Sequence, residues 1–60
     1  MKYLIEYTHT YYDVDYYYSD LLEIGMEAKN QTDAIIQFKK KFPSDFLNGY
    51  YVDSIQQLTE

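Results

Sequence analysis

The run KYLIEYTHTYY at residues 2–12 constrains the fold of this chain more than any other segment. It holds no glycine or proline and is rich in β-branched and aromatic residues, a composition that predicts a β-strand. Successive side chains of a strand face opposite sides of a sheet. The odd-numbered residues are therefore expected to share the buried face: Tyr3, Ile5, Tyr7, His9 and Tyr11.

A second strand is expected from about Tyr16 to Lys29, after the turn residues Asp13-Val14-Asp15. Residues 21–28 alternate between apolar side chains at even positions and mostly glycine or acids at odd positions, a pattern of inside and outside with the acids outside. Gly25 within this run indicates a bulge or a closely approaching neighbour. The first half of the chain is thus predicted to form a β-hairpin.

A helix is predicted over residues 31–42. Asn30 is a strong N-cap, and an acid three positions later, Asp33, can answer it as in a capping box. The apolar residues at helical spacing form one stripe: Ala34, Ile35, Phe38 and Phe42. Lysines at positions 39–41 suit the negative end of the helix dipole, and Pro43 prevents continuation.

The last element is predicted to be a strand from Tyr50 to Leu58, following a chain reversal at Asn48-Gly49. Val52 and Ile55 would face opposite sides of a regular strand, so its inward-facing parity stays open unless a bulge intervenes. An exposed edge on this strand would be a ready site for strand addition.

The element order β-β-α-β indicates an α+β fold. A right-handed crossover after the second strand places the third strand beside the first. The expected result is a three-stranded antiparallel sheet of order 2-1-3, with one helix packed on one face. The other face has nothing in the chain to cover it, and it is expected to hold Leu4, Thr8, Tyr12, Leu21 and some of residues 16–18.

The chain length of 60 residues predicts a single small domain. A domain of this size buries only roughly 60% of its unfolded surface, so it needs large core side chains or a partner. The sequence has no cysteine for disulfides and one histidine, which argues against a structural zinc site. Tyrosine and phenylalanine make up 20% of the residues and supply the large side chains. A homodimer remains open.

The net charge of −5 is concentrated in the first half of the chain. Residues 1–28 carry six acids and one lysine, whereas residues 29–60 carry equal numbers of each sign. This asymmetry, and the absence of arginine, argues against direct nucleic-acid binding, since phosphate contacts need cations. No apolar run approaches a transmembrane length, and no export signal is evident, so a cytoplasmic location is expected.

Catalytic and metal constellations are not expected. His9 lies between threonines that face the other side of the strand, so they cannot serve as its catalytic partners. An EF-hand loop starting at Asp13 would need glycine and glutamate where Tyr18 and Ile24 stand. The sequence therefore predicts neither an enzyme, nor a cofactor, nor a metal site.

The segments YYDVDYYYSD and EAKNQTDAIIQFKKKFP, together with small size, acidity and lack of cysteine, carry a resemblance. The chain resembles the small acidic phage-encoded inhibitors of host defence, the anti-CRISPR class with its DNA-mimicking members. The second segment also resembles the strand-cap-helix unit of small phage and plasmid ββαβ proteins. The resemblance implies a viral protein in the host cell cytoplasm that binds a nucleic-acid enzyme and blocks its basic groove.

The leading functional hypothesis is a non-enzymatic inhibitor that binds a protein with a basic groove through the first hairpin. The expected anchors are tyrosines and the expected charge contacts are acids: Tyr12, Tyr16, Tyr17 and Tyr18 with Asp13, Asp15, Asp20, Glu23 and Glu27. Two alternatives remain open. The tyrosine-rich sheet face closes a structural or regulatory homodimer, or the acids are only turn and surface residues of a soluble chain.

Overall fold

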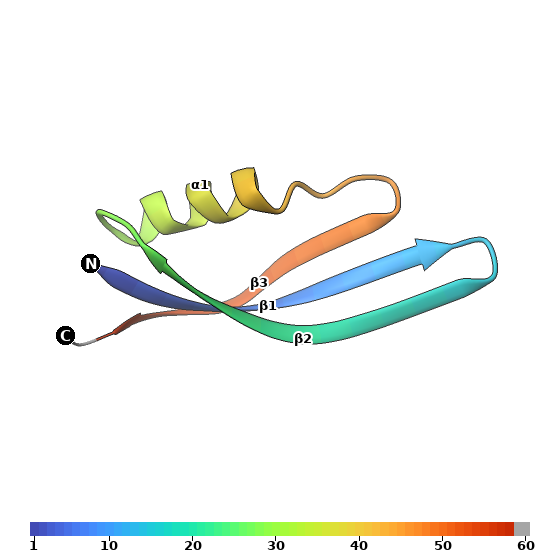
Figure 1. Cartoon of the computed structure of the whole chain (residues 1–60), viewed down its shortest axis with the longest axis horizontal. Helices are drawn as coiled ribbons and strands as arrows, with labels where there is room; N and C mark the ends of the chain where they lie inside the picture. The colour runs from blue at the N-terminus through green and yellow to red at the C-terminus, as the bar shows by residue number, and fades with distance from the viewer. Residues whose placement is uncertain (59–60) are drawn as a thin grey trace.

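The computed structural model describes residues 1–58, which form a sheet with one helix above it (Figure 1). The elements follow the order β1 (Lys2–Asp13), β2 (Tyr16–Glu27), α1 (Gln31–Lys41) and β3 (Asn48–Leu58). The strand order is β2-β1-β3, and both pairings are antiparallel. The predicted β-β-α-β fold and its 2-1-3 sheet are therefore confirmed.

The β1–β2 hairpin is paired without interruption from Lys2↔Glu27 to Asp13↔Tyr16. The last pair flanks a two-residue turn at Val14 and Asp15, whose first backbone N–H donates to the Asp13 carboxylate at 2.6 Å. Gly25 lies inside this regular ladder, and a Cβ there would meet only the Tyr3 carbonyl oxygen at 4.0 Å. The expectation of a bulge or a close neighbour at Gly25 is therefore wrong.

Helix α1 begins at residue 31 as predicted and ends at Lys41, one residue before the predicted end. The Asn30 side-chain oxygen accepts the Asp33 backbone N–H at 2.8 Å, while the Asp33 carboxylate accepts the Lys29 backbone N–H at 3.0 Å. The return bond thus reaches one residue before the N-cap, where a standard capping box would use the N-cap itself. Phe42 is the C-cap, and its backbone N–H donates to the Phe38 carbonyl just before Pro43.

The core lies between the odd-numbered face of β1 and one side of α1. Its buried side chains are Tyr3, Ile5, Tyr7, Ala28, Ala34 and Phe38. The Tyr7 ring meets the Phe38 ring edge-on at 4.9 Å between centroids and stacks on Phe42 at 5.3 Å. Aromatic rings therefore fill most of the small core, as the composition led us to expect.

A bulge in β3 resolves the parity of that strand. Glu6 pairs with Ser54 and the next residue, Tyr7, pairs with Val52, so Asp53 is the extra residue. The bulge brings Val52 and Ile55 to the same side, where both pack against the core.

The chain reverses before Asn48, earlier than the predicted reversal at Asn48-Gly49. Asn48 and Gly49 already belong to β3, and the bends of the preceding loop lie at residues 46 and 47. The Asp45 carboxylate accepts the backbone N–H groups of Leu47 and Asn48, each at 2.8 Å. This side-chain turn replaces the expected Asn-Gly turn, because Asp45 supplies two of the hydrogen bonds that a tight turn requires.

The molecule is elongated, with extents of 44 × 18 × 12 Å. Its Cα radius of gyration is 12.7 Å, whereas a compact chain of this length is expected near 10 Å. The excess comes from the β1–β2 hairpin, whose far end extends beyond α1 and the loop into β3 (Figure 1).

Candidate functional site

The face of the sheet opposite α1, here called the open face, is the main candidate site. Strand alternation places the even-numbered residues of β1 on this face, together with the residues paired to them on β2 and β3. Leu4, Thr8, Tyr12 and Leu21 all lie there, as predicted, and Tyr17 is the one residue of 16–18 that joins them. Leu21 is 83% exposed, so the face holds apolar side chains that nothing in residues 1–58 covers.

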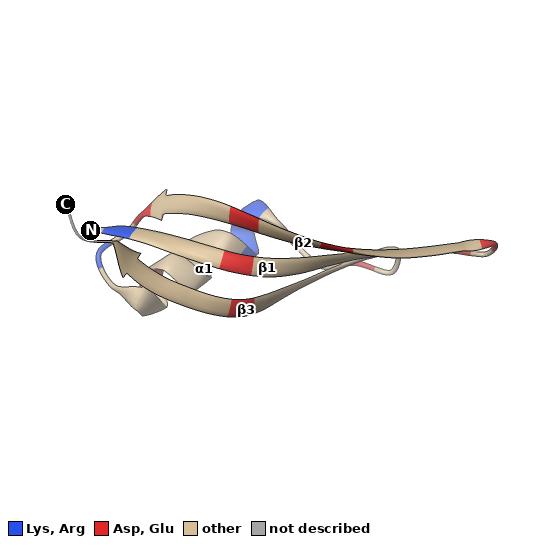
Figure 2. Ribbon diagram, turned by 90° about the horizontal axis from the view of Figure 1, so that it is seen from below, with Lys and Arg blue, Asp and Glu red and all other residues tan. Residues whose placement is uncertain are grey.

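A row of acids crosses the open face from strand to strand. Glu23 and Glu6 are directly paired, and Asp53 lies beside Glu6's partner Ser54 on β3. Figure 2, which views this face, shows the acidic segments of the three strands side by side. Carboxylates directly opposite each other repel, so the row lowers fold stability. The charge of this row is complementary to that of a cationic surface.

Hydrogen bonds hold two of these carboxylates in position. The Ser54 hydroxyl donates to Glu6 Oε1 at 3.0 Å, and the Thr8 hydroxyl donates to Asp53 Oδ2 at 2.6 Å. Both donors are neutral, so the negative charge of the row is not compensated by its own hydrogen bonds. The basic last turn of α1 lies behind the sheet in this view (Figure 2).

Three tyrosines also lie on the open face, between the acidic row and the hairpin tip. Tyr12 and Tyr17 form an edge-to-face pair with ring centroids 6.3 Å apart, and both rings are about 60% exposed. Tyr51, on β3, lies over Gly49, where an added Cβ would meet the Tyr51 hydroxyl at 2.8 Å. Gly49 therefore leaves room for the Tyr51 ring, which stays largely exposed.

The structure divides the predicted site residues among three places. Four lie on the open face: Tyr12, Tyr17, Glu23 and Glu27. Asp13 and Asp15 lie at the hairpin tip, and Tyr16, Tyr18 and Asp20 lie on the helix side of the hairpin.

Sequence reasoning missed Glu6, Tyr51 and Asp53 as members of the open face. The even-numbered position of Glu6 in the first strand was a usable signal. For Tyr51 and Asp53, the unresolved parity of the third strand hid the signal.

Glu27 differs from the other open-face acids because it already has a cationic partner. The amino-terminal ammonium of Met1 lies 3.1 Å from Glu27 Oε1 and also donates to the Ala28 carbonyl at 3.0 Å. Both groups of this ion pair are exposed, so it contributes little to stability. It does reduce the net negative charge at this end of the face.

The helix side of the hairpin carries a ladder of rings that continues the core toward the tip. His9 stacks on Tyr50 at 4.5 Å and meets Tyr18 edge-on at 5.8 Å, and Tyr18 stacks on Tyr11 at 5.5 Å. Desolvation by these neighbours, helped by the Asp20 carboxylate, raises the pKa of Tyr18. His9 Nε2 lies 2.9 Å from Asn48 Oδ1. We infer that this ladder stiffens the projecting hairpin.

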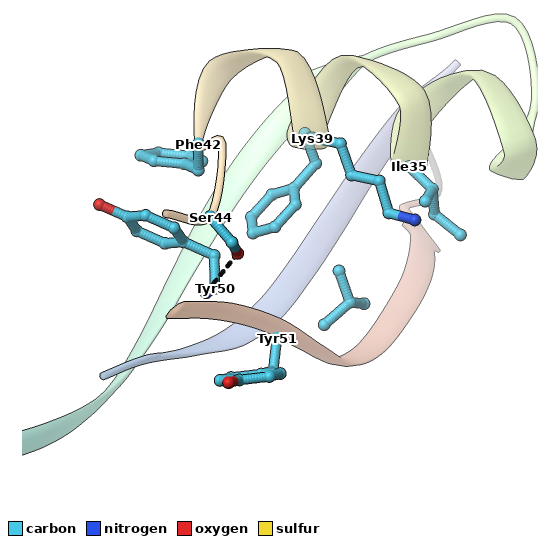
Figure 3. Close-up of a pocket in the computed structure, with 8 residues that line it drawn as sticks. Ile35, Lys39, Phe42, Ser44, Tyr50 and Tyr51 are labelled. Carbon is cyan, nitrogen blue, oxygen red and sulfur yellow. Dashed lines mark hydrogen bonds between the residues drawn. The ribbon is translucent and has the colours of Figure 1, made fainter. Parts of the chain in front are cut away.

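A groove of about 580 Å³ lies between α1 and β3, because one helix is too narrow to cover three strands (Figure 3). Its lining is mostly apolar, with Lys39 across the opening: Ile35, Phe38, Lys39, Phe42, Ser44, Tyr50, Tyr51 and Val52. The Ser44 hydroxyl accepts the Tyr50 backbone N–H at 3.0 Å. The Tyr51 side chain points away from the groove (Figure 3). The lining holds one ammonium group and no carboxylate or imidazole, so it offers no acid-base pair.

Residues 1–58 contain neither a cluster of metal ligands nor a membrane-spanning helix. No group of three or more histidine, cysteine or acidic side chains is placed to hold a metal ion there. The helix in this part of the chain is neither long nor apolar enough to span a membrane.

Comparisons with models of known protein families, with curated proteins and with solved structures find no match to this chain.

Proposed function

We propose that this protein is a non-enzymatic acidic inhibitor that binds a nucleic-acid-processing protein, for example a CRISPR effector. Its open face occupies the partner's basic nucleic-acid groove and thereby excludes the substrate. The observation that carries this proposal is the acidic row formed by Glu23, Glu6 and Asp53, which runs across the sheet and takes part in no ion pair within residues 1–58.

The spacing of the row supports mimicry of a phosphate backbone. Neighbouring strands lie about 4.8 Å apart, so the row presents roughly one charge per strand at that interval. A nucleic-acid strand presents one phosphate per about 3.4 Å of helix axis. The two intervals are similar, and a groove lined with lysine and arginine would offer cations to either.

The tyrosines supply the contact area that charge alone lacks. Tyr12, Tyr17 and Tyr51 expose broad rings on the same face, and tyrosine is enriched among the residues that dominate binding energy. Complementary charge would speed association, while these rings would slow dissociation. The acids of the hairpin tip, Asp13 and Asp15, extend the negative surface along the long axis.

The test uses the purified chain with purified CRISPR effector complexes and their DNA substrates, measuring DNA binding and cleavage. We expect the chain to inhibit both, with DNA in excess and raised salt each relieving the inhibition. The double variant Glu6→Lys/Glu23→Lys is expected to lose inhibition. Asp13→Lys/Asp15→Lys makes the same change in charge at the tip, so comparing the two shows which acids make the contact.

Ile36→Lys, on the exposed side of α1, is the control for added positive charge away from the open face. It is expected to inhibit as well as the parent chain. The proposal is wrong if Glu6→Lys/Glu23→Lys and Asp13→Lys/Asp15→Lys both inhibit fully. It is also wrong if the parent chain inhibits none of the CRISPR effector complexes tested.

The alternative is a small structural or regulatory phage or plasmid homodimer that uses the same tyrosine-rich face. The exposure of Leu21 and of the Tyr12–Tyr17 pair on the same face favours it. The acidic row disfavours it, because a two-fold axis through this face would bring like charges together. Solution mass distinguishes the two proposals.

A further inference from the structure

The outer edge of β2 is a second surface, distinct from the open face. The two-residue turn requires Asp13 and Tyr16 to exchange backbone hydrogen bonds, since no closer pair exists. Bonded and non-bonded pairs then alternate along the hairpin. The Ala28 N–H bonded to the Met1 carbonyl fits this alternation, as does the Tyr12 N–H bonded to the Leu47 carbonyl on the other side.

The odd-numbered residues of β2 therefore direct their backbone N–H and C=O groups away from β1. They are Tyr17, Ser19, Leu21, Glu23, Gly25 and Glu27. No hydrogen bond recorded within residues 1–58 uses these backbone groups. The edge extends over the whole length of β2 and has no bulge or proline, two of the features by which edge strands usually avoid pairing.

The edge of β3 is different, because the chain itself blocks much of it. The outward Tyr50 N–H donates to Ser44 Oγ at 3.0 Å, and the Asn48 carbonyl accepts the Asp45 N–H at 2.7 Å. The bulge at Asp53 then interrupts the strand further along. The expected site for strand addition on the third strand thus has little free ladder, and the intact free edge belongs to β2.

The charges on β2 indicate what kind of strand can pair there. Its charged residues are Asp20, Glu23 and Glu27, all acidic. Two copies of β2 side by side would place these carboxylates near one another, which disfavours self-pairing. A strand with lysine or arginine opposite them would gain attraction as well as backbone hydrogen bonds.

We propose that β2 accepts an antiparallel strand from an extended basic segment of a partner protein. Basic residues of that segment stand opposite Glu23 and Glu27, four positions apart, and an apolar residue stands opposite Leu21. The added strand widens the open face by one strand. This goes beyond the proposed function, because it depends on the backbone edge of β2, and either proposal can fail without the other.

The test uses a synthetic peptide as long as β2, of alternating threonine and valine, with lysines at the positions opposite Glu23 and Glu27. Binding is measured by titration, and hydrogen exchange is measured at individual amides. We expect slower exchange at Ser19, Leu21 and Glu23 on binding, with no change in the β3 amides. A peptide with glutamates in place of the lysines is expected to bind at least about tenfold more weakly.

Leu21→Pro removes one outward N–H without removing a bond to β1, and proline is tolerated at such edge positions. We expect it to weaken peptide binding by about tenfold or more. Gln57→Pro is the matched control, since Gln57 pairs with odd-numbered Tyr3 and its N–H also points outward, but from β3. It is expected to bind the peptide normally.

If Leu21→Pro does not fold, the double variant Glu23→Lys/Glu27→Lys keeps the test decisive, because it should prefer the glutamate peptide. The proposal is overturned if peptide binding protects β3 amides, or if the lysine and glutamate peptides bind equally. It is also overturned if the free chain shows concentration-dependent protection of the outward β2 amides, which would assign the edge to a second copy.

Discussion

Single side chains fix the two ends of the segment that joins β2 to β3. Asp33 and Asp45 each accept backbone N–H groups, Asp33 from Lys29 before the helix and Asp45 from Leu47 and Asn48 before β3. These hydrogen bonds favour the ionised carboxylate and hold the pKa of both residues below the usual value. Protonation of these two carboxylates at acid pH should therefore weaken the local structure that they hold.

The direction in which stability changes with pH follows from the lowered pKa values of Asp33 and Asp45. Their contribution to stability is fully present above the pKa of the unfolded chain, and it is lost as pH falls through the lower folded pKa. We expect thermal stability to decline below about pH 4, the ordinary pKa of an aspartate. Asp45→Asn, which retains an acceptor oxygen but does not titrate, should flatten this decline when melting temperature is followed against pH.

Asp15→Asn in the exposed hairpin turn is the comparison for loss of one carboxylate. It should leave the acid dependence as steep as in the parent chain. Equal flattening in both variants would mean that general charge, and not the turn hydrogen bonds, governs the acid response.

At the scale of elements, local pattern was enough to predict the hairpin and the helix, and the right-handed crossover rule then predicted the sheet order. Alternation marked the buried face of β1, and Asn30, Asp33 and Pro43 marked the helix ends. These signals are local, because a strand or a cap is determined by residues close in sequence. The sequence shows only that a bulge in β3 would bring Val52 and Ile55 to one face. Whether the bulge exists and where it lies depend on how β3 aligns with β1.

The same reason explains what was missed at the candidate site. Glu6 and Asp53 become neighbours only through the β1–β3 register, which no local pattern specifies. The prediction of a bulge or close neighbour at Gly25 was wrong because glycine occurs in strands for several reasons. Only the surroundings of the residue in the fold distinguish them.

The bulge leads to a prediction about deletions in the strands. Removing Asp53 leaves Val52, Ser54 and Ile55 in the alternation that β1 requires, so the sheet should form with a regular ladder. We expect a loss of about 1 kcal/mol, the usual value of one hydrogen bond such as that from Thr8. Chemical denaturation measures this loss.

Deletion of Gly25 is the matched comparison in β2. It moves Met26 to the open face and shifts every later pair, and a one-residue slip of this kind inverts the faces of a strand. A chain of this length is stable by only about 3–9 kcal/mol, so we expect this variant to unfold. Equal tolerance of both deletions would contradict the assigned register.

At the scale of the whole molecule, shape and charge act together. The long axis of 44 Å carries the acidic hairpin, while the basic turn of α1 lies on the opposite side of the sheet. The acidic row opposes pairing of two open faces, and the free edge of β2 is flanked by acids as well. We therefore expect an elongated monomer.

Small-angle scattering and sedimentation test this expectation. At low salt and neutral pH the mass should match 7.3 kDa and the radius of gyration should lie near 12.7 Å. A mass of about twice that value under these conditions would support the homodimer instead. The variant Glu6→Lys/Glu23→Lys leaves the row with both signs of charge, so two open faces repel each other less and it should dimerise more readily than Ile36→Lys if the open face can self-associate.

The central position of β1 has a consequence for how the protein is made. β1 is the first strand of the sequence, yet it pairs with β3, which the ribosome adds last among the described elements. Until residues 48–58 exist, a nascent chain can form only the hairpin and a loosely held helix, with one side of β1 unpaired. The sheet is therefore expected to close late in synthesis, and chains halted before β3 present their tyrosine-rich first strand to cellular chaperones.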